Sequence, residues 1–336
     1  MEKKKVLLTG ASGNVGSNTL LKLLEQGYEV TVFDLPSKKN KKVLEKFKDK
    51  VKIVYGSIND ALLVNKTVKD ADIVIHLAAI IPPLADKNHE LAKKVNYLGT
   101  ENVVHAIKYH NPNCFLIFAS SISVYGDRTK NYWINVNDPI SISEGDYYAM
   151  TKVVAEKMIR ESGINYTIFR LTGIMGLPHT DPLMFHMPLN TKLEIASSSV
   201  TAQAFANACG HTDKLNGNTY NLGGGENCRT DYREFLTVML NIYGLNIKYF
   251  KLEAFAEKNF HCGYYEDSYV LNDILDFQHE TLEDYYEFVR CNTPKAMRIM
   301  TKIFSPSIGY FLCKKSEPYM AKKKKRKLLI NRYYLK

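Results

Sequence analysis

A glycine-rich turn near the N-terminus constrains the fold of this chain more than any other feature of its sequence. Residues Thr9–Gly16 read Thr-Gly-Ala-Ser-Gly-Asn-Val-Gly, so glycines stand at positions 10, 13 and 16. An apolar run precedes the turn, and leucines spaced for one face of a helix follow it. Glycines at these places permit a tight turn, a close backbone approach to a ligand and close packing of helix on strand. We therefore expect a strand–turn–helix unit whose helix N-terminus binds the diphosphate of a dinucleotide.

Strand-like and helical patterns alternate after this turn. One helical segment carries an apolar stripe from Leu91 to Ala106 at near-helical spacing. Such alternation predicts an α/β protein with a doubly wound, parallel Rossmann sheet covered by helices on both faces. The pattern weakens after Gly176, where we expect a smaller C-terminal substrate lobe that also contributes to the sheet. The expected strands are 6–9, 29–33, 51–54, 73–76, 115–118, 166–170 and 219–222, and the later helices are 148–161 and 230–243.

An acidic residue ends the second expected strand. Asp34 lies 24 residues after Gly10, close to the roughly 20-residue spacing of a carboxylate that binds the ribose 2′-hydroxyl of NAD. A carboxylate there repels the 2′-phosphate of NADP, so the sequence favours NAD. The alternative is a helix-capping or turn residue beside Pro36, and Lys38 and Lys39 lie nearby.

A tyrosine and a lysine stand one helical turn apart in the segment 148–161. Tyr148 and Lys152 are spaced i, i+4 and therefore share one face of a helix. A phenol has a pKa of about 10, and a neighbouring cation lowers it by favouring the phenolate. We interpret Tyr148 as the group that exchanges a proton with a substrate oxygen while hydride moves to or from a nicotinamide. The alternative is a solvated helix face, where this spacing often occurs by chance.

Serines follow the fifth expected strand, where functional residues of such sheets gather. The segment Phe118–Gly126 reads Phe-Ala-Ser-Ser-Ile-Ser-Val-Tyr-Gly. A hydroxyl in this segment would hold the reacting oxygen. The alternative is a polar loop that caps the next helix.

Together these motifs resemble the extended short-chain dehydrogenase/reductase family, specifically its NAD-dependent epimerase/dehydratase branch. The resemblance extends to about Cys291 and includes His76–Ala79, Val95–Val103, Phe169–Gly173 and Tyr220–Gly225. It implies that Ser121 acts with Tyr148 and Lys152 in catalysis. It also implies that Ser123 and Tyr125 face the substrate.

The resemblance further implies cofactor contacts and an assembly. Ala78 and Ala79 line the cofactor, and Asn96 supports the active-site helix. Ser57-Ile58 stands where many members have an aspartate beside the adenine. Relatives commonly form homodimers through a four-helix bundle, here built from the helices around 91–107 and 148–159. The expected NAD contacts are Gly10, Ser12, Gly13, Asn14, Val15, Gly16, Asp34, Ser57, Ile58, Leu77, Ala78, Ala79, Asn96, Tyr148 and Lys152.

Departures from the family pattern bear on the reaction. Sugar-nucleotide 4,6-dehydratases of the family carry Thr-Asp-Glu where this chain has Ser-Ile-Ser at 121–123, so we disfavour dehydration. Members that bind nucleotide diphosphosugars usually have an arginine followed by an acid in the second lobe. The corresponding stretch here, His261–Asp267, has no arginine, and Arg229, Arg233 or the C-terminal tail are the alternatives.

These observations lead to one expected function and two alternatives. We expect an NAD-dependent epimerase or oxidoreductase that acts on a secondary alcohol, with a sugar nucleotide as the first substrate class. One alternative is an NAD-dependent dehydrogenase of a lipid-like or steroid-like alcohol at a membrane surface. The other is a non-catalytic NAD-binding redox sensor, which the tyrosine–lysine pair disfavours.

The net charge of +10 belongs to the C-terminal end. Residues 292–336 hold 13 Lys/Arg and one acid, so they carry +12 and leave about −2 for the first 291 residues. Nucleic-acid-binding domains spread basic residues over a folded face, so we expect no specific nucleic-acid partner. The six cysteines form no metal-ligand pattern, and we expect reduced thiols and no metal. We see no signal peptide and no membrane span, so we expect a cytoplasmic protein.

The C-terminal tail combines apolar and basic segments. Apolar residues recur over 296–311, where Pro306 is expected to interrupt any helix, and six basic residues occupy 322–327. One interpretation is a solvated, partly disordered tail. The alternative is peripheral contact of 296–336 with an anionic membrane at its inner surface, because each Lys/Arg gains about 1 kcal/mol there and apolar insertion adds a second signal. The chain is thus divided into a cofactor domain (1–175), a discontinuous substrate lobe (176–291) and the tail (292–336).

Overall fold

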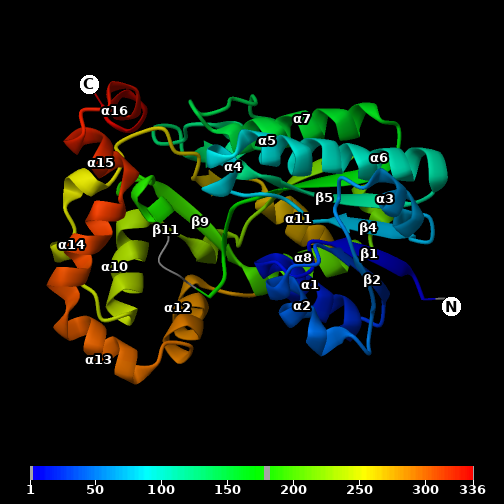
Figure 1. The fold of residues 1–336 in the computed structure, drawn as a ribbon, viewed down its shortest axis with the longest axis horizontal. Helices are drawn as coiled ribbons and strands as arrows, with labels where there is room; N and C mark the ends of the chain where they lie inside the picture. The colour runs from blue at the N-terminus through cyan, green and yellow to red at the C-terminus, as the bar shows by residue number, and fades with distance from the viewer. Residues whose placement is uncertain (1–2, 178–181, 336) are drawn as a thin grey trace.

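The computed structural model describes residues 3–177 and 182–335 and contains a seven-stranded parallel sheet (Figure 1). The strand order is β10-β7-β5-β4-β1-β2-β3, with every neighbouring pair parallel. The order therefore reverses between β1 and β4, the type of position where such sheets form a ligand crevice. The doubly wound sheet predicted from the sequence is confirmed. The strands are β1 Lys5–Thr9, β2 Glu29–Asp34, β3 Lys52–Tyr55, β4 Ile73–His76, β5 Phe115–Ser121, β7 Asn165–Leu171 and β10 Asn218–Leu222.

Helices cover both faces of this sheet because successive strand side chains point to opposite sides. Leu7 of β1 belongs to a core shared with α3, α6 and α7, whereas Leu8 belongs to a core shared with α1, α8 and α11. Both cores are dry layers of aliphatic and aromatic side chains. The helices are α1 Asn14–Glu25, α2 Lys38–Leu44, α3 Ala61–Val68, α4 Leu84–Lys87, α5 His89–Ala92, α6 Gly99–His110, α7 Tyr147–Glu161, α8 Ser198–Ala208, α9 Thr212–Leu215 and α11 Ser268–Leu275.

The expected helix through 91–106 contains a short π-helical segment, Lys93–Leu98, between α5 and α6. This segment changes the helical spacing and places Asn96 toward the interior, where only 1% of it is exposed. The apolar stripe read from the sequence is therefore split. Val103 and Ala106 are buried in the sheet core, and Leu91 is only partly buried.

A second lobe lies beyond one end of the sheet. It holds the three-stranded sheet β11-β9-β8 and a core that includes Leu193 and Ile195 of β9 with Phe235 and Leu236 of α10. A two-stranded pair, β12-β6, lies beside it. The lobe elements are β6 Trp133–Ile134, β8 Gly173–Met175, β9 Lys192–Ser197, β11 Arg229–Asp231, β12 Tyr264–Tyr265, α10 Tyr232–Ile242 and α12 Leu282–Cys291. The 3₁₀ turns are Glu45–Phe47, Ile122–Tyr125, Pro182–Phe185, Glu226–Cys228, Ile247–Tyr249 and Leu252–Ala254.

The C-terminal segment folds into four helices that run as a column along the outer side of this lobe (Figure 1). The interpretation of a disordered tail is wrong for these residues, because Leu312, Cys313 and Tyr333 are buried. The prediction that Pro306 interrupts a helix is confirmed, since one helix ends at Ile303 and Pro306 lies in the first turn of the next. The four helices are α13 Lys295–Ile303, α14 Ser305–Lys315, α15 Glu317–Lys323 and α16 Lys327–Tyr333.

Membrane-spanning helices, metal-binding clusters and disulfides are absent from the part of the chain that the structure describes. None of the helices in this part is both long and apolar enough to cross a membrane. The described residues also hold no cluster of His, Cys, Asp or Glu that could bind a metal ion. All six cysteines are free thiols, and Cys291 is the exposed one among them.

Candidate functional site

The glycine-rich turn connects β1 to α1 and leaves no room for side chains. Gly10 has a positive φ of 73°, and a Cβ on it would lie 2.8 Å from the backbone nitrogen of Ala78. A Cβ on Gly16 would lie 2.2 Å from the carbonyl oxygen of Gly10. Gly13 precedes α1, whose first turn contains no acidic residue. This bare helix N-terminus, flanked by Ser12, Asn14 and Val15, fits the diphosphate of a dinucleotide.

Asp34 lies at the end of β2 and faces this turn. Its Oδ2 accepts a hydrogen bond of 2.7 Å from the backbone N–H of Ser12. Its Oδ1 accepts from the backbone of Leu35 and from the Asn40 side chain, each at 2.8 Å. The carboxylate is thus fixed beside the glycine turn, where a ribose hydroxyl would bond to it. Asn40 was not found from the sequence, because only the fold brings α2 back over β2.

The other residues expected to line the cofactor follow the neighbouring strands. Leu77, Ala78 and Ala79 come directly after β4, and the N–H of Ala78 donates to Thr9 Oγ1 at 3.2 Å. Ser57 and Ile58 follow β3, and Ile58 packs against Gly99. β4 pairs with β1 and β3 pairs with β2, so these groups lie at the same carboxyl edge of the parallel sheet as the glycine turn and Asp34, the edge where ligands of such sheets bind.

Asn96 ties the loop after β4 to α7. Its amide exchanges two hydrogen bonds with the backbone of Ile80, at 2.7 and 2.9 Å. It also donates to Thr151 Oγ1 at 3.1 Å. Thr151 precedes Lys152, so the expectation that Asn96 supports the active-site helix has a direct geometric basis.

Ser121, Tyr148 and Lys152 come together at the end of β5. The Ser121 side chain lies close enough to the Tyr148 phenol to lower the pKa of that phenol. The ammonium of Lys152 lies 5.8 Å from the centre of the Tyr148 ring and donates to the carbonyl oxygen of Ala119 at 2.7 Å. A phenol, a hydroxyl and an ammonium therefore share one face of α7 and the strand beside it.

Burial governs the charges of this group. Burial raises the pKa of Tyr148 well above its ordinary value, although the Ser121 side chain lowers it. Burial lowers the pKa of Lys152 to about 8, while the negative charge of Glu156 raises it. The sequence predicted a lowered phenol pKa, so the net direction at Tyr148 is the opposite in this structure. The phenol is protonated at neutral pH and can donate its proton.

The two residues expected to face substrate, Ser123 and Tyr125, are both buried. Ser123 donates to the Ser121 hydroxyl at 3.0 Å and so orients it. The Tyr125 hydroxyl donates to Asn221 at 2.6 Å and accepts from Arg170 at 2.8 Å. Both polar tips are bonded to protein partners.

A buried charged network lies behind Ser121, Tyr148 and Lys152. Glu156 forms an ion pair with Arg170 at 2.8 Å and also bonds to Ser120 and Arg160. Burial by itself would raise the pKa of Glu156. The ion pair with Arg170, the hydrogen bond from Ser120 and the charge of Arg160 together hold this pKa below its ordinary value. Glu156 was missed in the sequence, although its position one turn after Lys152 on the same helix was a usable signal.

The arginines considered for a substrate diphosphate have different surroundings. Arg229 is engaged, because its Nε bonds to buried Glu194 at 3.0 Å and it stacks over Trp133 and Tyr264. Arg233 lies exposed on α10. From the tail, Arg332 reaches the turn before α7. A Cβ on Gly145 would lie 3.0 Å from its guanidinium carbon.

Comparison with known proteins identifies related sequences and folds. The model of the NAD dependent epimerase/dehydratase family matches residues 6–190. A 3-beta-hydroxysteroid dehydrogenase of Mycolicibacterium neoaurum is 33% identical over 188 residues, 51% of this chain and 48% of that protein. A UDP-glucose 4-epimerase of Lactobacillus helveticus is 28% identical over 180 residues, 51% of this chain and 52% of that protein. The chain thus spans about half the length of the curated relatives it matches.

Solved structures share the fold over more of the chain. The UDP-glucose 4-epimerase from Bifidobacterium longum in complex with NAD⁺ and UDP superposes with a TM-score of 0.71 and 19% identity, over 88% of this chain and 100% of that one. The dTDP-glucose 4,6-dehydratase DesIV from Streptomyces venezuelae gives a TM-score of 0.71 at 19% identity, over 85% and 96% of the two chains.

Proposed function

Because this chain belongs to the NAD-dependent epimerase/dehydratase family, we propose that it is an NAD-dependent enzyme that oxidises a secondary alcohol to a ketone or reduces the ketone back to the alcohol. The observation that carries the proposal is the contact of Ser121 with the Tyr148 phenol, one helical turn from Lys152. A bound nicotinamide supplies the hydride acceptor or donor. The first substrate class is a sugar nucleotide, which an epimerase or a simple oxidoreductase would act on.

The protein residues have separate tasks in this mechanism. Tyr148 gives its proton to the carbonyl oxygen when the carbonyl is reduced, and in the opposite direction its phenolate takes the proton of the substrate hydroxyl. Ser121 binds the reacting oxygen, and Ser123 fixes the direction of the Ser121 hydroxyl. Lys152 holds a positive charge beside the phenol and stabilises its anionic form. Gly10, Gly13, Gly16 and Asp34 hold the dinucleotide, with NAD preferred over NADP.

The second candidate is a dehydrogenase of a steroid-like or lipid-like alcohol. It is favoured by the likeness to a 3-beta-hydroxysteroid dehydrogenase and by the absence of an arginine in the stretch 261–267. The same Ser121, Tyr148 and Lys152 would serve both substrates, because the reacting group is a secondary alcohol in each.

A substrate screen separates the two candidates. The full chain would be incubated with NAD⁺ and either UDP- and dTDP-hexoses or 3β-hydroxysteroids, and NADH formation and epimer formation would be measured. We expect turnover in one class, with the sugar nucleotides first. Tight NAD binding without turnover of any secondary alcohol would instead support the redox-sensor alternative.

Two expectations about assembly and location remain proposals. We propose a homodimer in which α6 and α7 of each protomer form a four-helix bundle, supported by the exposed apolar side chains of Met150 and Val154 on α7. We also propose peripheral contact of the C-terminal segment with an anionic membrane, supported by its excess of basic residues and exposed apolar side chains. The divisions 1–175, 176–291 and 292–336 stay proposed boundaries.

A further inference from the structure

The helix α13 presents its apolar side to solvent. No residue of α13 is buried, and Met300, Ile303 and the C-cap residue Phe304 are 55%, 64% and 51% exposed. We call these three residues the outer face of α13. Helices at protein surfaces normally bury their apolar stripe, so α13 has the reverse orientation.

The orientation of α13 is fixed by a close backbone contact. Gly244, just after α10, has a positive φ of 78°, and a Cβ on it would lie 2.3 Å from the carbonyl oxygen of Arg298. The backbone of α13 thus rests on a residue without a side chain. A rotation that buried the outer face would break this contact.

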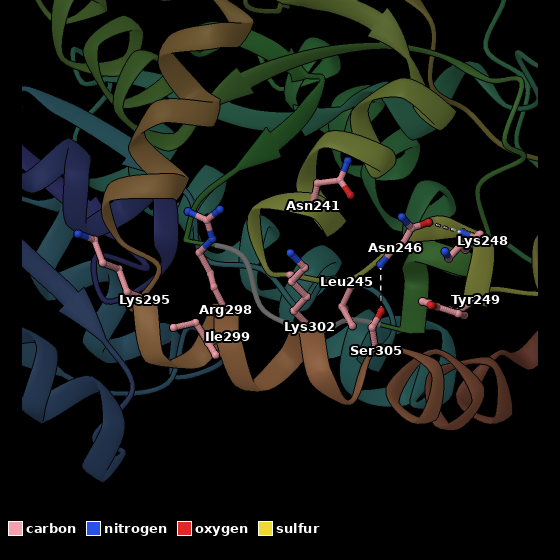
Figure 2. A pocket seen from close by; sticks show the side chains of 11 residues that line it. Asn241, Leu245, Asn246, Lys248, Tyr249, Lys295, Arg298, Ile299, Lys302 and Ser305 are labelled. Carbon is pink, nitrogen blue, oxygen red and sulfur yellow. Dashed lines mark hydrogen bonds between the residues drawn. The ribbon is translucent and has the colours of Figure 1, made fainter.

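The opposite side of α13 lines a basic cavity of about 670 Å³. Figure 2 shows Arg298 and Lys302 pointing from α13 toward Asn241, while Lys248 lies at the other side of the cavity, beside Asn246. Lys295 lies at the start of the same helix. We call Lys248, Lys295, Arg298 and Lys302 the basic cavity residues.

The charge of this cavity is uncompensated. None of its lining residues is acidic, and none of the four cations takes part in an ion pair within the described residues. A second large pocket differs, because its Lys3, Lys4 and Lys5 are accompanied by Asp70, Asp72 and Asp213. The cavity beside α13 therefore fits an anion, and Ser305 and Asn241 add polar groups.

An apolar outer face above a cationic cavity matches the interface of a bilayer that contains anionic phospholipids. Apolar side chains enter the boundary of the acyl chains, and basic groups meet the phosphates. A second copy of the chain is a poorer match. In a two-fold contact of α13 with α13 of a second copy, the cations of one copy would face the cations of the other. Glu317, the one acid of 292–336, is already bonded to Tyr333 and so does not offset these charges.

We propose that α13 is the membrane-docking element of this protein and that the basic cavity residues bind the phosphate of an anionic lipid headgroup. This deepens the membrane contact proposed above and does not depend on the catalytic assignment. It also separates α13 from the lysine run 322–327. That run lies on α15 and the turn after it, at the other end of the column of C-terminal helices (Figure 1).

The test is co-sedimentation of the full chain with vesicles at low salt. We expect binding to phosphatidylcholine vesicles that contain phosphatidylglycerol and none to phosphatidylcholine alone. The variant Met300→Ser/Ile303→Ser/Phe304→Ser is expected to lose binding. The variant Lys295→Gln/Arg298→Gln/Lys302→Gln is expected to bind about 100-fold more weakly, which is about 3 kcal/mol for three cations.

A matched control removes the same charge elsewhere. The variant Lys322→Gln/Lys323→Gln/Lys324→Gln is expected to bind vesicles within about threefold of the unsubstituted chain. Salt screens these exposed lysines, so their charges contribute little at the membrane contact of α13. All substituted residues are exposed. NADH binding measured without vesicles shows whether each variant is folded, and it tests the cofactor proposal independently of vesicle binding.

Four results would overturn the proposal. The first is no binding of the unsubstituted chain to anionic vesicles. The second is an equal loss of binding in the control and in the α13 variants. The third is that light scattering shows a dimer, that this dimer dissociates in the variant of Met300, Ile303 and Phe304, and that the chain does not bind vesicles. Binding of soluble glycerol phosphate without vesicle binding would likewise reject the lipid as the occupant.

Discussion

At the scale of single residues, Lys152 is a charge held against the cost of burial. Its ammonium is buried, and its hydrogen-bond acceptor is the neutral carbonyl of Ala119. Burial lowers its pKa to about 8, against about 10.5 in the unfolded chain. The charged form therefore prevails at neutral pH and is lost as the pH rises through about 8. Burial of the imidazole, and in second place the positive charge of Lys152, lowers the pKa of His76 to about 3.

This gives a prediction for the pH dependence of cofactor binding. If cationic Lys152 bonds to the nicotinamide ribose, NADH affinity falls by about tenfold between about pH 7 and about pH 9.5, the scale of one hydrogen bond to a charged group. Fluorescence titration across this range measures it. Lys152→Ala is expected to bind weakly at every pH. An equally steep fall in Lys152→Ala would assign the titration to another group.

Asp34 sets the choice between the two dinucleotides. Its carboxylate is 7% exposed and anchored by Ser12, so an added 2′-phosphate meets a fixed negative charge. We expect NADH to bind at least about tenfold more tightly than NADPH, which corresponds to about 1.4 kcal/mol of binding free energy. Asp34→Asn keeps the shape, removes the charge and should narrow the ratio. Equal affinities in the unsubstituted chain would contradict the assignment.

At the scale of elements, the C-terminal helices are part of the second lobe. Tyr333 of α16 is 2% exposed and donates to Glu317 of α15 at 2.5 Å. It packs with Ala256 and Tyr334 in a small core. The column from α13 to α16 therefore covers the lobe and brings Arg332 to the turn before α7.

Removal of the Tyr333 ring tests this role. Tyr333→Ala is expected to lower the free energy of unfolding by about 3 kcal/mol or somewhat more, the range for deleting a buried aromatic side chain. Leu328→Ala on the same helix is the control, because Leu328 is 83% exposed, and should change stability little. Chemical denaturation measures both. Equal effects of the two substitutions would mean that α16 does not pack on the lobe.

The elements also show what the sequence could predict. The run Ile73–His76 was found with its correct ends, because a central parallel strand is a continuous apolar segment. β9 was missed, since it carries the buried Glu194. Its carboxylate is held by Arg229, by the Ser268 hydroxyl and by backbone N–H groups from distant segments. The four C-terminal helices escaped prediction because their local pattern does not reveal which side is covered.

The candidate site divides in the same way. Gly10, Asp34 and Tyr148 lie in local motifs, so the sequence located them and the fold placed them at one edge of the sheet. Arg170 acts through a contact between separate elements, which no spacing in the sequence reveals. Asn40 lies only six residues after Asp34, but its contact depends on the turn between β2 and α2.

At the scale of the whole molecule, the proposed dimer depends on α6 and α7. Val154 is 40% exposed on α7, beside Met150 at the same exposure. Val154→Arg would place a charge in the centre of the proposed four-helix bundle, and burial of an unpaired charge is costly. Light scattering at micromolar concentration is expected to show a dimer for the unsubstituted chain and a monomer for Val154→Arg. A monomer in both cases would exclude this assembly.

The central claim is that Tyr148 transfers the proton during NAD-dependent redox chemistry, and one measurement tests it most directly. The chain and its Tyr148→Phe variant would be saturated with NAD⁺, mixed with the substrate class active in the screen, and followed by nicotinamide absorbance or product analysis. We predict that Tyr148→Phe binds NAD⁺ normally and reacts at least about 10²-fold more slowly, the scale of losing a positioned proton-transfer group. Equal rates in the two proteins would contradict the mechanism.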